Sequence, residues 1–478
     1  MSGARQTVVA ARSPLVEEMA GGTLGDQRLH ERRDRLMAVL EQHPDAAFPE
    51  ACANDAEVEA LYRFLRNRRV SLKTLVEPHV VATHARCAAM GEVLVIHDTT
   101  DMVFAGEIPR TGLTPLGKGR QGFWLHTALA LSADGLRAPL GVLSLLPFVR
   151  PVRPRGTVKH AHVRFQDPAK ESRCWGDGVA AVRTLFGDPR STIHVMDRAG
   201  DSYELFAAML QHGDRFVVRL NHDRRVLTDD GAGHLHEMAS RRQVLGERQV
   251  PLATRRVGDR SPKARHQHPP RAGRIATLTF AAQPLTLLRP QARRYAHVPA
   301  ALHVHVVYAW EVAPPPGETP IEWRLLTTEP IETLDQVLRI VDWYRARWVI
   351  EEFFKALKTG CAYEKRQLAS LATLLVALAL LAPIAWQLLL LRHVAHGLPD
   401  GAATAVLSPR QLHVLQAAPV GARLGPTPTV GNVLLTLARL GGHLKQNGDP
   451  GWLVLGRGMQ KLLWMEAGWA AAERARPM

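Results

Sequence analysis

The sequence predicts an α/β fold in which an open sheet carries an antiparallel β insertion and helical segments lie at both ends. Three observations predict this class. Short β-branched runs at 93–96 (VLVI) and 191–196 (STIHVM) are each followed by polar residues or a helical pattern. Short alternating runs separated by Gly, Pro and Arg-rich links fill residues 222–320. Residues 22–70 and those after 368 have the composition of helices.

Length and charge indicate several domains and an anionic partner. A chain of 478 residues is too long for one simple core, so about two or three domains are expected. We place them at 1–70, 71–370 and 371–478, with the insertion at about 222–320 inside the second. The formal net charge is +15, and its 60 Lys and Arg residues are spread over the chain, which favours a polyanion-binding surface.

The N-terminal segment reads as polar helices, the second of them capped by Asn54 or Asp55. Its arginines make it a candidate DNA-contact domain: Arg28, Arg32, Arg33, Arg63, Arg66, Arg68 and Arg69. The alternative interpretation for any one of these arginines is a solvated helix face.

The central segment predicts strands that end at acidic residues. The strand at 93–96 leads into Asp98, and the strand at 191–196 leads into Asp197, with a helix starting near Asp201. Further strands are expected at 215–220, at 323–330 and, as a pair, within 123–148. A helix is expected from about 167 to 186, and residues 255–272 are expected to form a mobile basic loop.

Residues 344–360 (YRARWVIEEFFKALKTG) predict one helix that ends at Gly360. Four of its polar residues project within an arc of roughly 60° at about 100° per residue: Tyr344, Arg347, Glu351 and Lys358. One interpretation is a solvated face with helical salt bridges. The other is a site where Glu351 holds a divalent metal and the remaining three contact phosphate oxygens.

An uncharged stretch at 368–391 is long enough to cross a bilayer. It contains many Ala residues together with Ser370, Thr373, Pro383 and Gln387, which favours a buried helix or helix pair broken or kinked at Pro383 over a membrane span. The four cysteines are far apart, and the first 20 residues lack the apolar core of a signal peptide. A reduced cytosolic setting is expected.

Three acids occupy equivalent places in this pattern: Asp98, Asp197 and Glu351. In open α/β sheets, sites form beyond the carboxyl ends of strands. Three carboxylates that converge there would hold two Mg²⁺ ions roughly 3.5–4 Å apart, the arrangement for in-line displacement at phosphorus. Any single Asp could instead be a turn or cap residue. Asp101 is the alternative metal ligand if the side chain of Asp98 points away from the other two acids.

The motifs DTT and DRAGD after strands, and Tyr–two–Arg–three–Glu–six–Lys on a helix, resemble the signature of a known family. They are similar to the DD(E/D) cut-and-paste transposases of the bacterial insertion-sequence-four family, and most similar to members that excise DNA through hairpin ends. The similar segments extend along nearly the whole chain. His97 is a departure, because an acidic residue is expected there.

The resemblance implies a ribonuclease-H-like catalytic core, an N-terminal domain that recognises transposon ends and a C-terminal helical domain that pairs two subunits. By position, it implies that Asp98, Asp197 and Glu351 form the metal triad for Mg²⁺, with Mn²⁺ as a substitute. The implied DNA contacts are Tyr344, Arg347, Lys358, Arg219 and Trp323, the last stacking on a flipped base.

The implied function is a Mg²⁺-dependent DNA transposase that nicks its element's ends, forms and reopens hairpins, and joins the 3′ ends to target DNA. Its partners would be double-stranded DNA and a second copy of the chain, in the bacterial cytoplasm at the nucleoid. Three alternatives remain open: a stand-alone nuclease with the same core, a DNA-binding repressor without cleavage activity, and a membrane protein resting on residues 368–391 alone.

Overall fold

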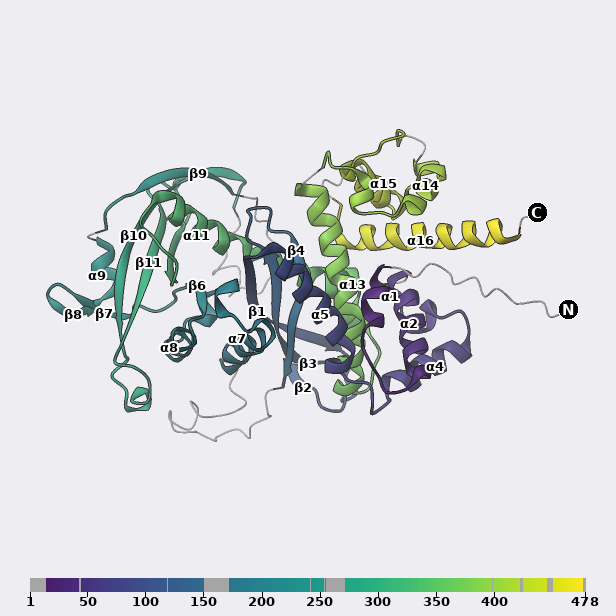
Figure 1. Ribbon diagram of the computed structural model, residues 1–478, viewed down its shortest axis with the longest axis horizontal. Helices are drawn as coiled ribbons and strands as arrows, with labels where there is room; N and C mark the ends of the chain where they lie inside the picture. Colours follow the sequence, from purple (N-terminus) through teal and green to yellow (C-terminus); the bar gives the residue numbers. More distant parts are fainter. Residues whose placement is uncertain are drawn as a thin grey trace. The chain divides into compact units, whose positions relative to one another are not determined.

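The structure is a computed structural model. It describes residues 14–475 apart from residues 43, 118, 150–171, 241, 253, 255–270, 398, 422–423 and 445–449. The chain forms two compact units (Figure 1). Unit 1 comprises Met1–Val93, Asp98–Val158 and Trp348–Met478, and unit 2 comprises Leu94–His97 and Lys159–Arg347. The expected loop at 255–272 lies almost entirely outside the described residues.

Unit 2 contains a large mixed sheet. Its strands are β5 (Thr192–Met196), β6 (Arg215–Arg219), β7 (Arg225–Thr228), β8 (Gly231–His234), β9 (Gly246–Leu252), β10 (Arg274–Leu288), β11 (Ala301–Glu311) and β12 (Glu322–Thr327). Neighbours in the sheet follow the order β5-β6-β12-β11-β10-β7-β8, and β9 pairs with β10. β5 and β6 are parallel, whereas every pair from β6–β12 onward is antiparallel.

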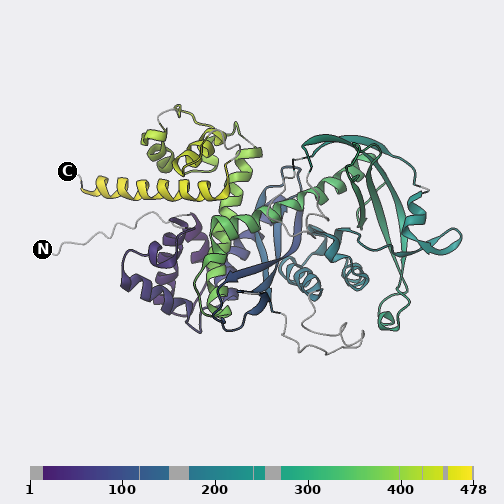
Figure 2. The ribbon, with the colours of Figure 1, turned by 180° about the vertical axis from the view of Figure 1, so that it is seen from behind.

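The antiparallel part confirms the predicted insertion, and its long strands β10 and β11 run side by side in Figure 2. The helices of unit 2 are α7 (Arg173–Phe186), α8 (Tyr203–His212), α9 (Leu235–Ser240) and α11 (Leu334–Ala346). α8 ends where Gly213 adopts the left-handed conformation, with φ of 73°, which a residue with a side chain rarely adopts. The parallel pair β5–β6 and the helices around it confirm the expected α/β class.

The remaining strands lie in unit 1. Its strands are the second half of β1 (Val93–Ala105), β2 (Thr114–Gly117), β3 (Arg120–Ser132) and β4 (Pro139–Phe148). The predicted strand pair within 123–148 is confirmed as β3 and β4, which pair in antiparallel register. The predicted end of the first strand is wrong, because β1 continues through Asp98 to Ala105. Alternating burial in its second half, from Met102 onward, keeps the strand extended past the polar residues.

The helices of unit 1 are α1 (Pro14–Ala20), α2 (Gln27–Gln42), α3 (Phe48–Ala51), α4 (Asp55–Leu65), α5 (Leu72–Met90), α12 (Trp348–Lys355), α13 (Leu371–Gly397), α14 (Pro409–Ala417), α15 (Val430–Leu440) and α16 (Trp452–Ala475). Asn54 caps α4 by accepting the N–H of Glu57, as the sequence predicts. Helices α14, α15 and α16 share an apolar core that includes Leu415, Leu437 and Leu455.

The uncharged stretch forms one continuous helix, α13, with Pro383 inside it. The helix is long and apolar enough to cross a membrane by length and composition, but 83% of its most apolar window is buried inside the protein. It lies against α5, β4 and α15. The expectation of a buried helix is confirmed. No break occurs at Pro383, because packing on several sides supports the helix where the proline removes a backbone donor.

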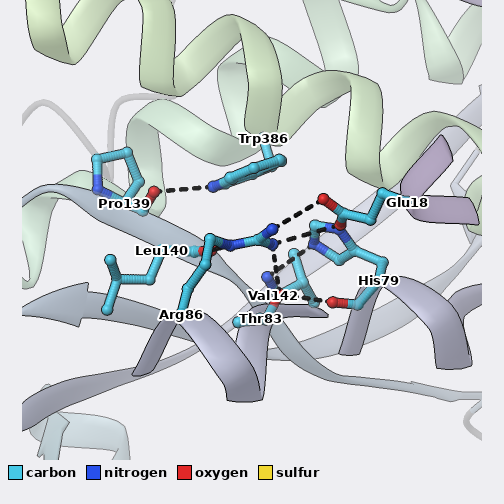
Figure 3. Close-up of polar contacts among 8 residues, drawn as sticks. All are labelled: Glu18, His79, Thr83, Arg86, Pro139, Leu140, Val142 and Trp386. Carbon is cyan, nitrogen blue, oxygen red and sulfur yellow. Dashed lines mark hydrogen bonds and ion pairs between the residues drawn. The ribbon is translucent and has the colours of Figure 1, made fainter. Parts of the chain in front are cut away.

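A buried polar cluster fixes α1 to α5 (Figure 3). Glu18 of α1 accepts hydrogen bonds from Nδ1 of His79 at 2.5 Å and from Arg86 at 2.8 and 3.3 Å. Nε2 of the fully buried His79 accepts the backbone N–H of Val142 in β4 at 3.0 Å, so Nδ1 holds the ring proton. Burial lowers the pKa of His79, with Glu18 opposing that shift.

Arg86 extends the same cluster to β4 and α13. Its Nε donates to the carbonyl of Leu140 at 2.6 Å, and its guanidinium lies 4.3 Å from the ring centroid of Trp386. The indole N–H of Trp386 donates to the carbonyl of Pro139 at 2.9 Å (Figure 3). The N-terminal helices are thereby held on the layer formed by α5, β4 and α13 within unit 1.

Candidate active site

Asp197 lies immediately after β5, at the carboxyl end of the parallel strand pair, as the sequence predicts. It caps a short 3₁₀ turn, Arg198–Gly200, by accepting the N–H of Ala199 on Oδ1 at 2.8 Å. The residue is partly exposed. A carboxylate held by its own turn and open to solvent at a strand end is suited to bind a cation.

Asp201, four residues further along, has a different environment. It is buried, and its Oδ2 accepts the backbone N–H groups of Asn221 and His222 at 2.7 and 2.8 Å. Its Oδ1 accepts from Nε of Arg224 at 2.9 Å, and the two side chains form an ion pair. This carboxylate connects the start of α8 to the chain that leaves β6.

Asp98 lies within β1, where the chain passes from unit 2 to unit 1. The residue is partly exposed, and its Oδ1 accepts the N–H of Thr99 at 2.7 Å. The hydroxyl of Thr99 hydrogen-bonds to Nδ1 of the buried His126 at 2.9 Å in unit 1. Burial lowers the pKa of His126 to about 3, so this histidine is neutral at physiological pH.

The burial of His97 accounts for the histidine at a position where the family pattern has an acidic residue. Because successive side chains of a strand point to opposite faces, His97 and Asp98 face opposite ways. His97 is fully buried in unit 2, where its Nε2 and Nδ1 of the buried His194 are 2.8 Å apart. Burial lowers the pKa of His194 to about 4, an effect that Asp214 opposes. An acidic residue at position 97 would place a charge in this core.

The signature segment is not one helix, so that prediction is wrong. α11 ends at Ala346, Arg347 is its C-cap, and α12 begins at Trp348 and runs to Lys355. Residues Ala356–Gly360 then form a π-helix. The break at Arg347 coincides with the boundary between the two units, so the uniform angular spacing assumed for one helix does not hold across it.

Two adjacent glutamates on α12 also differ. Glu352 is paired with Lys355 at 2.6 Å and with Arg392 of α13 at 3.4 Å, so it ties α12 to its neighbours. Glu351, the predicted metal ligand, is partly exposed in the first turn of α12. Asp98 and Glu351 lie in unit 1 and Asp197 lies in unit 2, and the convergence of the three remains a prediction.

Lys358 has acidic partners in unit 1. Its Nζ donates to the carbonyl of Asp101 at 2.5 Å and lies 3.5 Å from the carboxylates of both Asp101 and Glu364. Glu364 in turn accepts the N–H of Val103 in β1 at 2.8 Å. The segment after the π-helix is thereby tied to β1. Lys358 also lines a cavity of about 560 Å³ that Lys365 and Arg457 share.

Three of the predicted DNA contacts gather in unit 2. Tyr344 is buried, and its ring packs edge-on against the half-buried Trp323 with 5.4 Å between centroids. Arg219 in β6 donates from Nη2 to the carbonyl of Glu322, the residue before Trp323, at 3.0 Å. This arrangement leaves part of the indole accessible and supports it from behind with Tyr344.

Residues 12–70 match a family described as transposase DNA-binding, and residues 157–386 match a family described as transposase DDE domain. The chain therefore carries the DNA-binding and DDE domains of a transposase. Among solved structures, it is similar to a piggyBac transposase synaptic complex with hairpin DNA, determined by electron cryo-microscopy. The identity is 10% and the TM-score 0.34, over 80% of this chain and 73% of that chain.

The DNA-binding segment of the transposase contains the N-terminal arginines. Arg28 and Arg63 are exposed, Arg32 is partly exposed, and Arg63 lies 3.7 Å from Glu59. Arg33 is buried, and its guanidinium donates to the carbonyl of Gly22 at 2.8 Å. The expectation that Arg33 belongs to a DNA-contact face is wrong, because its side chain holds the turn between α1 and α2.

The donor atoms of the predicted triad suit a hard divalent metal ion. All three predicted ligands are carboxylates, and carboxylate oxygens are the side-chain ligands that Mg²⁺ prefers. Asp197 presents its carboxylate at a strand end with one oxygen already oriented by a backbone N–H. His194 and Glu364 were not predicted as supporting residues, since their partners are distant in sequence and leave no local motif. Asp101, predicted as the alternative to Asp98, pairs with Lys358.

Proposed function

We propose that this transposase belongs to the insertion-sequence-four family and excises its element by Mg²⁺-dependent nicking, hairpin formation and hairpin opening, then joins the 3′ ends to target DNA. The observation that carries the proposal is the environment of Asp197. Asp197 lies in the segment that matches the DDE family, directly after a parallel strand, and is partly exposed. Asp201, four residues away, is instead buried in structural hydrogen bonds.

In this proposal, Asp98, Asp197 and Glu351 hold Mg²⁺, with Mn²⁺ as a substitute. When bound, the ions activate the attacking oxygen and stabilise the leaving oxygen in an in-line displacement at phosphorus. His194 and His126 are neutral and add no positive charge that would compete with the metal. Tyr344, Arg347 and Lys358 orient phosphates of the cleaved end, and Lys358 exchanges its acidic partners for DNA.

Trp323 and Arg219 bind the hairpin end of the DNA. A half-buried indole supported by Tyr344 offers one face to an unstacked base, and base–aromatic stacking stabilises by about 1–3 kcal/mol per base. Arg219, bonded to the backbone beside Trp323, contacts a neighbouring phosphate. The flipped base is held only while the hairpin forms.

The proposal assigns three domains. Residues 1–70 recognise the transposon end through Arg28, Arg32 and Arg63. Residues 71–370 carry the chemistry. Residues 371–478 pair two subunits in a complex of two DNA ends. The exposed Trp464 and Trp469 on α16, 50% and 38% accessible, support an interface there. Light scattering with and without paired ends measures the assembly.

The test of the chemistry uses a labelled transposon end with Mg²⁺ and resolves nick, hairpin and double-strand break on a gel. Asp98→Asn, Asp197→Asn and Glu351→Gln should each lower the cleavage rate by about 10³-fold or more, since a metal ligand supplies several kcal/mol of transition-state stabilisation. Binding of the end should persist, because removing a negative charge does not weaken attraction to DNA.

Asp101→Asn and Glu352→Gln are the matched controls, one on β1 and one beside Glu351, and should cleave at close to the wild-type rate. Loss of cleavage in Asp101→Asn but not in Asp98→Asn would move the ligand to Asp101. Cleavage of DNA without transposon ends would indicate a stand-alone nuclease. End binding by wild type with no Mg²⁺-dependent cleavage would indicate a repressor.

A further inference from the structure

Two histidines and an aspartate come together at the base of the β7–β8 hairpin in unit 2. Nδ1 of His234 lies 3.4 Å from Oδ2 of Asp223, and Nδ1 of His236 hydrogen-bonds to the same oxygen. The three potential ligand atoms all lie within 4.8 Å of one another. Each of the three residues is exposed, so an ion can reach them from solvent.

The backbone under this cluster is fixed. Leu235, between the two histidines, is fully buried, and its N–H donates to the carbonyl of Arg224 at 3.0 Å. The N–H of His236 donates to Oδ1 of Asp223 at 3.0 Å, which orients the carboxylate with Oδ2 toward both rings. Such hydrogen bonds to a ligating carboxylate are typical of metal sites.

The loop that carries Asp223 is anchored as well. The buried Asp201 accepts the N–H groups of Asn221 and His222 and pairs with Arg224, so every neighbour of Asp223 on both sides is tied down. Arg225 lies opposite His234 in the β7–β8 ladder. Only the three side chains need to adjust when an ion enters.

We propose that Asp223, His234 and His236 bind a divalent transition-metal ion, with Zn²⁺ as the expected occupant. Two imidazole nitrogens, one carboxylate oxygen and a water make the four-coordinate donor set that Zn²⁺ accepts, whereas Mg²⁺ prefers oxygen alone. Bonds of about 2.0–2.1 Å place tetrahedral ligands roughly 3.3–3.4 Å apart, close to the separation of His234 and Asp223.

Entry of the ion requires one proton shift. His236 Nδ1 carries the proton that it donates to Asp223, and that proton moves to Nε2 as Nδ1 takes the metal. The total number of protons is unchanged by this shift. The ion then links the chain after β6 to the junction of β8 and α9, which closes the hairpin of the insertion at its base.

The site uses none of the proposed catalytic ligands, so its test is independent of the proposed function. Full-length protein stripped with EDTA is titrated with ZnCl₂ by calorimetry, with millimolar Mg²⁺ present to saturate carboxylate sites. One Zn²⁺ per chain is expected. His234→Ala and His236→Ala should each weaken Zn²⁺ binding at least tenfold. Hydrogen exchange in the β7–β8 hairpin should slow on adding Zn²⁺ to wild type only.

His212→Ala, which removes an exposed histidine at the end of α8, is the matched control and should bind as wild type. Metal-free melting curves of all variants should superimpose, since the altered side chains are exposed. The proposal is overturned if wild type binds no Zn²⁺ in the presence of Mg²⁺, or if the two cluster variants bind as tightly as wild type. Loss of the Zn²⁺ site in Asp197→Asn would also overturn it, by assigning the ion to the catalytic carboxylates.

Discussion

Asp197 and Asp201 belong to one five-residue motif, yet they have opposite environments. Asp197 is partly exposed and bonded to its own turn, whereas Asp201 is buried and receives two backbone N–H groups and an arginine. The DRAGD motif contains both aspartates, so the sequence alone does not distinguish them. The contrast shows that a motif identifies the residue types of a site, while burial and hydrogen bonding decide which carboxylate remains available for a metal.

The same division recurs on α12. Glu352 is held by Lys355 and Arg392, and the neighbouring Glu351 is the one that the family signature selects. Asp201 and Glu352, which pair with arginines, stabilise the segments that carry Asp197 and Glu351. A buried, paired carboxylate cannot change partners without leaving its arginine uncompensated, which makes it unsuited to exchange metal ions.

The largest effect that tests this contrast is on stability. Asp201→Ala should lower the free energy of unfolding by about 3–5 kcal/mol, because it leaves Arg224 unpaired and two backbone N–H groups without their acceptor. Asp197→Ala should lower it by only about 0.5–2 kcal/mol, because it removes the cap of one short 3₁₀ turn and leaves no buried charge unpaired. Urea unfolding monitored by circular dichroism measures both.

The double variant Asp201→Ala/Arg224→Met is the control. Removing both partners should recover part of the lost stability, since no uncompensated charge then remains. Equal destabilisation by Asp197→Ala and Asp201→Ala would break the contrast and make Asp197 a structural residue as well.

Sequence reasoning predicted the fold class well because its signals were local. The β-branched runs before Asp197 and around residues 215–219, the alternating insertion and the cap at Asn54 all reappear in the structure. Two local signals misled. Polar residues after Val93–Ile96 suggested that the strand ends there, yet β1 continues to Ala105. Favourable helix propensity suggested one continuous helix, yet α11 ends before Arg347.

The supporting residues of the site could not be predicted in the same way. His97 meets His194, and Lys358 meets Asp101, across long sequence separations that only the folded sheet brings together. Arg33 looked like its exposed neighbours in sequence and is buried in the structure. Such contacts depend on tertiary packing, which composition and spacing do not encode.

A second test compares buried and exposed titratable groups through pH. The pKa of His194 is about 4 in the folded protein and about 6.5 when unfolded, so the unfolded state takes up the proton first. Its contribution to stability is complete above pH 6.5 and is lost as pH falls to 4, by about 3 kcal/mol. The free energy of unfolding of wild type and His194→Gln should therefore converge on acidification.

Other buried histidines shift in the same direction, and the paired measurement removes their effect. Burial also lowers the pKa of His126 and of His79, which both variants retain. Asp214 and Arg183 near His194 are likewise common to both proteins. Parallel pH profiles for wild type and His194→Gln would show that His194 does not titrate as a buried neutral group.

A third test separates Trp323 and Tyr344, the two aromatic residues of the proposed hairpin site. Trp323→Ala should leave the first nick intact and slow hairpin formation about 10- to 100-fold, since only that step needs the flipped base held. Tyr344→Ala should instead reduce nick and hairpin together, because Tyr344 is proposed to orient phosphates and its buried ring also packs on Trp323. Equal loss of both steps in Trp323→Ala would make Trp323 a packing residue.

The smallest effect distinguishes two arginines around α11. Arg347 is the C-cap where the helix breaks, and Arg339 lies exposed on the same helix with its guanidinium 5.2 Å from the ring centroid of Trp343. If Arg347 contacts a phosphate, Arg347→Gln releases about one counterion fewer on binding. The slope of log affinity against log salt should then fall by about one. Arg339→Gln should leave the slope unchanged, because its cation is engaged with an indole of its own helix. Affinities for a labelled end at several salt concentrations give both slopes, and equal slopes for the two variants would remove Arg347 from the DNA contact.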